Sequence, residues 1–171
     1  MQFNYFYRII LTIFTIRGVI YQKEELFFIG HSEISDSVFP FLISEIERHI
    51  IEYGVLEFIV GNYGGFDRMA FKAVKCIKNN YPNVTLSLLI PYHPSRYKLE
   101  YFEGVDDIIY PFAAQKVPQR VAIIRANRYM VGRVDYLIAC VSYSAGNSYK
   151  LMKYAEKRQN LVVTNIIKQK V

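Results

Sequence analysis

Residues 59–70 read IVGNYGGFDRMA. An apolar run leads into three closely spaced glycines, and residues with helical spacing follow them. A buried strand that ends in a glycine-rich turn before an amphipathic helix is typical of α/β proteins. The stretch predicts a strand over residues 56–60 and a helix over 66–80. The inward face of that helix is expected to carry Met69, Ala70, Ala73, Val74 and Ile77.

The same alternation of strand and helix continues on both sides of this stretch. Further strands are predicted over 25–30, 84–90, 107–110, 136–141 and 161–167, and further helices over 35–53, 118–134 and 147–158. Gly54 is expected to end the first helix, and the polar stretch 91–104 has room for one irregular helix. Near-continuous apolar strands joined by helices imply a parallel sheet covered on both faces. The expected fold is therefore α/β, a Rossmann-like three-layer sandwich with a mainly parallel sheet of five to six strands.

Length and charge narrow the class of protein. A chain of 171 residues fits one ordinary domain. The 21 Lys and Arg residues exceed the 15 Asp and Glu residues, and the net charge of +6 suits a nucleotide, a nucleic acid or a membrane surface without choosing among them. Cys76 and Cys140 lie in apolar runs, which predicts two buried thiols in a reducing cytoplasm. The three histidines lack metal-ligand spacing, so no metal is predicted.

The first 22 residues form an apolar extension. Arg8 and Arg17 bracket an uncharged run of eight residues, which is too short for a membrane span. A secretory signal would need a cleavage site that does not follow. Three interpretations of the segment remain open: it is an extra helix or strand, an interfacial anchor, or residues upstream of a natural start at Val19. The predicted organisation is an extension over 1–22 and a single domain over 23–171.

Ligands of such folds bind beyond the carboxyl ends of the strands. The loop after the second predicted strand offers glycines that let a ligand approach the backbone, and the helix start that follows offers unpaired N–H groups for a phosphate. Asp67, in the first turn of that helix, either caps it or accepts hydrogen bonds from a ribose or base. The candidate binding residues of this loop are Gly61, Asn62, Gly64, Gly65 and Asp67.

Three other segments contribute candidates. Gly30 and His31 follow the first strand of the domain, and we expect the histidine to contact a ligand rather than to act in catalysis. Arg125 and Arg128 share a face of one helix, and their guanidinium groups can grip a phosphate; Arg125 is the first choice. The last loop contributes Gly146, Asn147 and Ser148 at a helix start. Tyr63, Tyr92 and Tyr143 lie in edge loops and could stack on a base, whereas Asp135 is expected to serve as a cap or ion-pair partner.

Several of these segments together resemble the SLOG superfamily, which is named for the DNA-processing Smf proteins and the Lonely Guy proteins. The resemblance rests on Phe28–His31, on the G-N-x-G-G-F-D-R-x-A string of residues 61–70, and on an R-x-N-x-x-M-V block followed by D-x-L-I-A over residues 125–139. The small YpsA-like members of Gram-positive bacteria are the most similar. The resemblance covers roughly residues 25–168. It implies a Rossmann-like fold and a site for a nucleotide or a nucleotide-derived ligand.

One departure from the family pattern concerns catalysis. Lonely Guy enzymes carry P-G-G-x-G-T-x-x-E, whose glutamate and a nearby arginine serve N-glycosidic cleavage. Here residues 142–148 read SYSAGNS, and Lys150 and Leu151 follow where that glutamate would be expected. The catalytic assignment therefore does not transfer, although the N–H groups near Gly146–Ser148 keep a phosphate-binding role.

Three functions follow as expectations. The leading one is a binding or sensing protein for a nucleotide-derived small molecule, which needs no cofactor. The alternative is a nucleotide N-glycosidase or phosphoribohydrolase with Asp67 as the catalytic carboxylate. The third is DNA binding of the DNA-processing type, supported by the charge of +6. The protein is expected to be cytoplasmic without stable membrane insertion, and a homo-oligomer is left open.

Overall fold

The structure is a computed structural model that describes residues 14–16, 19–21, 23–113 and 117–167. Six strands form one sheet in which every neighbouring pair is parallel. The strands are β3 (Glu25–Gly30), β4 (Glu57–Val60), β5 (Thr85–Leu89), β6 (Asp107–Ile109), β7 (Tyr136–Cys140) and β8 (Val162–Asn165). Their order across the sheet is β6-β5-β4-β3-β7-β8.

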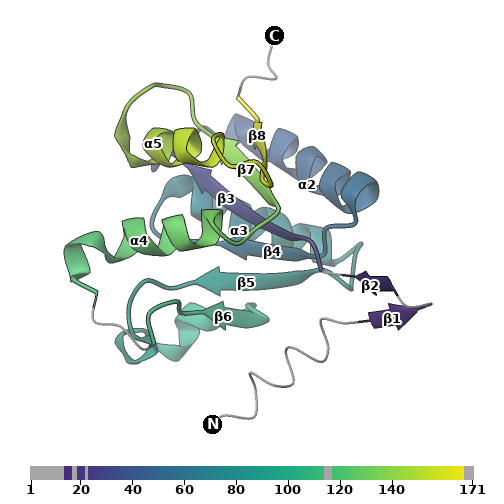
Figure 1. Cartoon of the computed structure of the whole chain (residues 1–171), viewed down its shortest axis with the longest axis horizontal. Helices are drawn as coiled ribbons and strands as arrows, with labels where there is room; N and C mark the ends of the chain where they lie inside the picture. Colours follow the sequence, from purple (N-terminus) through teal and green to yellow (C-terminus); the bar gives the residue numbers. More distant parts are fainter. Residues whose placement is uncertain (1–13, 17–18, 22, 114–116, 168–171) are drawn as a thin grey trace.

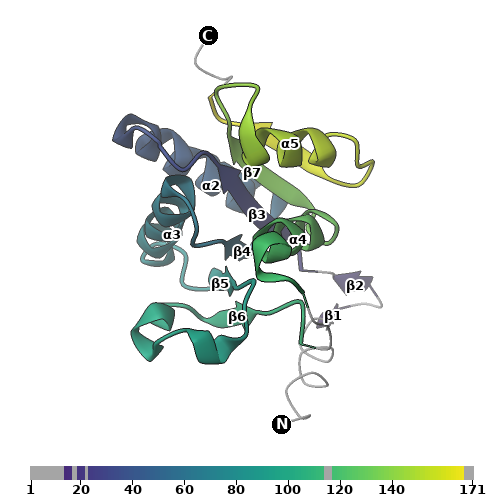
Figure 2. The same ribbon diagram turned by 90° about the vertical axis from the view of Figure 1, so that its left-hand side faces the viewer.

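Helices cover both faces of the sheet (Figures 1 and 2). The helices are α2 (Phe39–Tyr53), α3 (Gly65–Lys78), α4 (Gln119–Val131) and α5 (Gly146–Ala155). Figure 2 shows α2 and α3 on one face and α4 and α5 on the other. The predicted α/β three-layer sandwich is confirmed, and within the described residues its sheet is entirely parallel.

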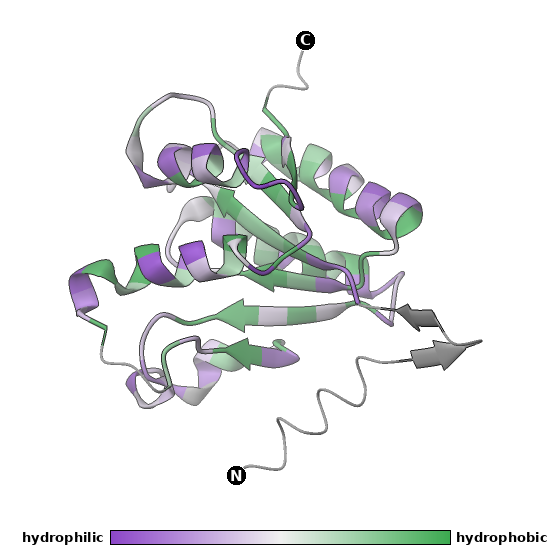
Figure 3. Ribbon diagram, viewed as in Figure 1, coloured by the Kyte–Doolittle hydropathy of each residue, from purple (hydrophilic) through white to green (hydrophobic). Residues whose placement is uncertain are grey.

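The alternation of side chains along β3 explains the two layers. Phe28 belongs to the buried cluster under α2 and α3, whereas its neighbour Phe27 belongs to the cluster under α4 and α5. Successive side chains of a strand point to opposite faces, so a strand buried on both sides must be apolar throughout. Figure 3 shows this as hydrophobic strands beneath helices of mixed character.

The element bounds agree with the sequence prediction to within four residues, the largest difference being the start of α2, which a 3₁₀ turn over Asp36–Val38 precedes. Gly54 ends α2 with a φ of 69°, as expected for a left-handed helix cap. The stretch 91–104 holds two short 3₁₀ helices, Pro94–Arg96 and Leu99–Phe102, instead of one irregular helix. The prediction of two buried thiols is wrong for Cys76, which is exposed, while Cys140 is buried. Cys76 lies on α3 beside the inward positions 73, 74 and 77 but points to solvent.

The strand order creates a topological switch point between β3 and β7. The chain enters this sheet at β3, builds outward through β4 and β5 to β6, and then crosses back to place β7 on the other side of β3. The loops after β3 and β7 therefore lead to helices on opposite faces of the sheet. Such a divergence opens a crevice at the carboxyl ends of the two strands.

Two short strands precede the sheet. They are β1 (Phe14–Ile16) and β2 (Val19–Tyr21), which pair antiparallel in a separate two-stranded sheet. Figure 1 shows them beyond the amino ends of the parallel strands, on the side away from the crevice. The remainder of the predicted extension, residues 1–13, 17–18 and 22, lies outside the described residues. None of the helices in the described ranges has the length and apolarity that crossing a membrane requires.

Candidate functional site

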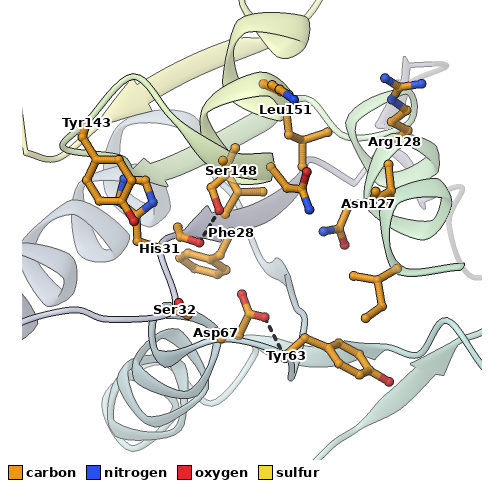
Figure 4. Close-up of a pocket in the computed structure, with 18 residues that line it drawn as sticks. Phe28, His31, Ser32, Tyr63, Asp67, Asn127, Arg128, Tyr143, Ser148 and Leu151 are labelled. Atoms are coloured by element: carbon orange, nitrogen blue, oxygen red, sulfur yellow. Dashed lines mark hydrogen bonds between the residues drawn. The ribbon is translucent and has the colours of Figure 1, made fainter. Parts of the chain in front are cut away.

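A cavity of about 560 Å³ lies at the switch point, at the carboxyl ends of β3, β4 and β7. Its wall comes from the ends of these strands, the loops that follow them and one face of α4 (Figure 4). The lining residues are Phe28–Ser32, Tyr63, Gly64, Asp67, Ile123, Ile124, Asn127, Arg128, Tyr143, Gly146–Ser148, Lys150 and Leu151. Its volume falls within the range of small-molecule sites, roughly 300–1,000 Å³.

The structure brings most of the predicted site residues together around this cavity. Those that line it are Gly30, His31, Gly64, Asp67, Arg128, Gly146, Asn147 and Ser148. The other four, Gly61, Asn62, Gly65 and Arg125, do not line it. The candidates from three loops therefore converge, while three of the five candidates of the glycine-rich loop and the first-choice arginine lie elsewhere.

The start of α3 is occupied by the neighbouring loop. The N–H groups of Gly65 and Phe66 donate to the carbonyl oxygens of Ser32 and His31, at 2.9 and 3.3 Å. A Cβ on Gly65 would lie 2.2 Å from the Ser32 oxygen. The glycine is needed so that the two loops can touch, and the first two helix donors are already used. The sequence-based role of this helix start as a phosphate cradle therefore gains no support from the geometry.

Asp67 joins the glycine-rich loop to the cavity. Its carboxylate accepts a hydrogen bond from the Tyr63 N–H, with Oδ2 at 2.9 Å from the nitrogen. This donor lies before the N-cap residue Gly64, so the bond stabilises the turn that precedes α3 and does not cap a helical N–H group. Burial raises the pKa of the carboxyl above its ordinary value, while the backbone N–H groups and the Arg68 guanidinium oppose that rise. Asp67 thus presents a carboxylate at the cavity wall in a position that the loop fixes.

His31 is buried, with only 4% of its surface exposed. Its Nε2 accepts a hydrogen bond from the Ser142 N–H at 3.1 Å. Its ring also stacks on Tyr143, with centroids 3.7 Å apart and planes 2° from parallel. An Nε2 that accepts a hydrogen bond carries no proton, so the ring is neutral with the proton on Nδ1. Burial lowers the pKa of His31, which favours the same neutral form. The contacts of this ring are with the loop after β7.

The start of α5 is open, unlike the start of α3. Gly146 has a φ of +83°, and no heavy atom lies within 4 Å of where its Cβ would be. The Ser148 hydroxyl donates to the Gly30 carbonyl oxygen at 2.6 Å, which ties the helix start to β3. In the described part of the chain, no acceptor is found for the backbone N–H groups of residues 146–148. This helix start therefore offers unpaired donors and a positive dipole end at the cavity wall.

Two basic residues line the same cavity as these donors. Lys150 and Arg128 line the cavity, and neither forms an ion pair within the described residues. The Arg128 guanidinium carbon lies 5.7 Å from the centre of the Tyr154 ring, a cation–π contact that orients the side chain. Against these two cations, Asp67 is the one carboxylate among the described lining residues. The cavity is therefore positively biased on the side of α4 and α5.

The face of α4 that meets the cavity differs from the one predicted. Ile123, Ile124, Asn127 and Arg128 line the cavity, which is the i, i+1, i+4, i+5 spacing of one helix face. Arg125 falls outside this face and is exposed. Figure 4 shows Asn127 and Asp67 on opposite sides of the cavity. The two isoleucines of α4, together with Phe28 of β3 and Leu151 of α5, add apolar surface to the cavity wall.

The comparisons with known proteins add no family. No family model matches the chain, and no curated protein matches it. Within the described residues, no three His, Cys, Asp or Glu side chains gather where they could hold a metal ion.

Sequence reasoning missed Asn127, Lys150 and the two isoleucines of α4. The signal for Asn127 was present, because it stands inside the R-x-N-x-x-M-V block. Lys150 lies one turn after the start of α5, where it can reach back toward the donors of that start. Tyr63 and Tyr143, considered as stacking residues, both line the cavity, whereas Tyr92 does not.

Proposed function

We propose that the protein binds a small phosphorylated ligand of the nucleotide type in the cavity between β3, β4 and β7. The observation that carries the proposal is the open start of α5, whose unpaired N–H groups face the same cavity as Arg128 and Lys150 at a topological switch point. Unpaired donors, a helix dipole and two unneutralised cations together favour an anion with several acceptor oxygens. A phosphate group is such an anion.

The rest of the cavity suits the remainder of a nucleotide. Its apolar side, formed by Ile123, Ile124 and Leu151, can cover a base, and Tyr63 adds an aromatic ring at the edge. Asp67 can accept hydrogen bonds from ribose hydroxyls, and Asn127 can both donate and accept. In this proposal the protein binds or senses its ligand without reacting with it.

The test compares two arginines of the same helix. Arg128→Ala is expected to weaken the binding of nucleoside monophosphates about ten- to a hundredfold, because a hydrogen bond to a charged group contributes about 1.5–3 kcal/mol. Arg125→Ala removes the same charge three residues away and is expected to leave affinity unchanged, because Arg125 does not line the cavity. Isothermal titration with a panel of nucleoside monophosphates and the matching nucleosides measures both effects.

The outcomes separate the proposal from a general charge effect. Equal losses in the two variants would mean that diffuse positive charge, and not the cavity, attracts the ligand. The absence of any measurable binding across the panel would refute the nucleotide proposal. The bare nucleosides are expected to bind wild type and Arg128→Ala alike, because Arg128 is assigned to the phosphate alone.

A second candidate is hydrolysis of the N-glycosidic bond of a nucleotide, with Asp67 as the carboxylate. It is favoured by one observation, a cavity carboxyl whose pKa is raised by burial. Incubation with nucleoside monophosphates, followed by chromatography of the free base, tests it. If the reaction occurs, Asp67→Asn is expected to abolish base release while binding largely survives. Base release that persists in Asp67→Asn would place the chemistry on another group.

A further inference from the structure

One contact in the cavity wall has no part in the proposed ligand binding, the contact between His31 and the loop after β7. The ring is nearly fully buried, and both its edge and its face are engaged by this loop. The edge accepts the Ser142 N–H through Nε2, and the face stacks on Tyr143. Three residues after this tyrosine the chain turns through Gly146 into the open start of α5. His31 therefore holds one end of the segment whose other end is the proposed phosphate site.

We propose that His31 is a positioning residue whose neutral ring holds the loop 142–145 in the ligand-binding conformation, so that protonation of the ring releases the loop and weakens ligand binding. This inference rests on the proposed function for its binding readout. The Ser142 hydrogen bond is possible only while Nε2 lacks a proton, since a protonated imidazole has two donors and no acceptor. A protonated ring would direct an N–H at the Ser142 N–H, and the two donors would repel each other.

Among the residues that the structure describes, no charged group forms an ion pair with His31 that would replace the lost bond. The charged groups that line the same cavity are Asp67, Arg128 and Lys150, and none of them forms an ion pair with His31. The other titratable groups around it are Tyr143, which stacks on the ring through its face, Tyr63 of the same cavity, and Cys140, whose carbonyl oxygen accepts the His31 N–H. Burial is the cause of the lowered pKa of His31. Protonation would therefore place an uncompensated charge in a buried position, which the loop can relieve by moving away.

The sign of the pH dependence follows from the neutral form. Ligand binding is expected to be intact at pH values above the pKa of His31 in the folded protein and to be lost as the pH falls through it. Stability follows the same direction, because the unfolded chain takes up a proton below about pH 6.5 that the folded chain resists. His49 is also buried with a lowered pKa, so thermal melting alone does not isolate His31. The test must therefore observe the loop itself.

The first arm needs no ligand. In NMR spectra of the full chain recorded from pH 8 to pH 5, the Ser142 amide resonance is expected to move with the titration of the His31 ring. The Tyr143 ring resonances are expected to shift at the same midpoint, because stacked rings shield each other. A Ser142 amide that stays unchanged while His31 titrates would overturn the proposal.

The second arm measures AMP affinity at each pH in wild type and two variants. His31→Gln keeps an acceptor near Nε2 that does not titrate, and His31→Phe keeps the stacking plane without any acceptor. Relative to His31→Gln, the wild type is expected to lose about tenfold in affinity once the pH falls below the His31 midpoint seen in the NMR titration, the size of one hydrogen bond. The phosphate of AMP also titrates near pH 6, but its effect is common to both proteins and cancels in the ratio.

His31→Phe is expected to bind AMP weakly at every pH. A parallel pH dependence of wild type and His31→Gln would overturn the inference, as would full affinity in a folded His31→Phe. If AMP fails to bind wild type at any pH, the proposed function fails, while the NMR arm still decides whether His31 holds the loop. Circular dichroism of each variant shows whether it is folded.

Discussion

A Gly65→Ala variant is expected to melt about 6–12 °C below the wild type, which corresponds to a loss of about 3 kcal/mol in the free energy of unfolding. The added Cβ would lie 2.2 Å from the Ser32 carbonyl oxygen, far inside contact distance. That oxygen also accepts the Gly65 N–H at 2.9 Å, so it can retreat only by giving up the bond. The loop after β3 and the start of α3 must then separate. Differential scanning calorimetry measures the change.

Gly64→Ala is the matched control for this prediction. A Cβ on Gly64 would meet its nearest atom at 3.6 Å, an ordinary contact, and Gly64 has an extended backbone with a φ of −140°. We expect this variant to melt within about 2 °C of the wild type, as for substitutions that strain nothing. If both variants lost a similar amount in melting temperature, the close contact between Gly65 and the Ser32 carbonyl group would not be the reason that position 65 needs a glycine.

A Gly146→Ala variant is expected to lose about tenfold or more in affinity for a nucleoside monophosphate. Gly146 has a φ of +83°, which costs an L-residue about 1–2 kcal/mol. The chain can relieve this strain by rotating the peptide groups at the start of α5, which turns the N–H groups of residues 146–148 away from the cavity. Losing one charge-assisted hydrogen bond at this point accounts for the expected change. Calorimetric titration at fixed pH checks it.

Gly54 provides the control for strain without binding. It has a φ of +69°, and no heavy atom lies within 4 Å of its Cβ position, as for Gly146. It ends α2, in a part of the chain that does not line the cavity. Gly54→Ala is therefore expected to lower stability by a similar amount, about 1–2 kcal/mol, and to leave affinity unchanged. A Gly146→Ala variant that binds as tightly as Gly54→Ala would remove the start of α5 from the proposed site.

Much of the fold could be predicted from the sequence because each strand is apolar throughout and each helix has one apolar stripe. Asp135, which was expected to serve as a cap or ion-pair partner, lies directly before β7. Its carboxylate accepts the Glu25 N–H at the amino end of β3, at 3.0 Å. The exposure of Cys76 was missed because an apolar neighbourhood in sequence does not fix which side of a helix a residue occupies. That side is set by the packing of α3 against the sheet and α2.

The site was predicted less completely than the fold. Helical spacing shows which residues share a face, but it does not show which face meets the cavity, so Arg125 was preferred and Asn127 was left out. The loop glycines were interpreted as room for a ligand, whereas Gly65 makes room for the Ser32 carbonyl group. The contact of His31 with Ser142 joins residues 111 positions apart. No local pattern carries such a contact, because it exists only once β3 and β7 are neighbours.

The strand order also governs how the chain comes off the ribosome. β3 is synthesised before the other parallel strands, yet its partner β7 pairs Leu26 with Tyr136, some 110 residues later. Once β6 has emerged, β3 to β6 can pair while one edge of β3 stays uncovered and open to pairing with another chain. Closing so distant a pair is slow, since the intervening chain must be ordered first. We therefore expect nascent chains that end before residue 136 to be the aggregation-prone species. A nucleotide added during translation cannot rescue them, since the β7–α5 wall of its cavity has not yet been made.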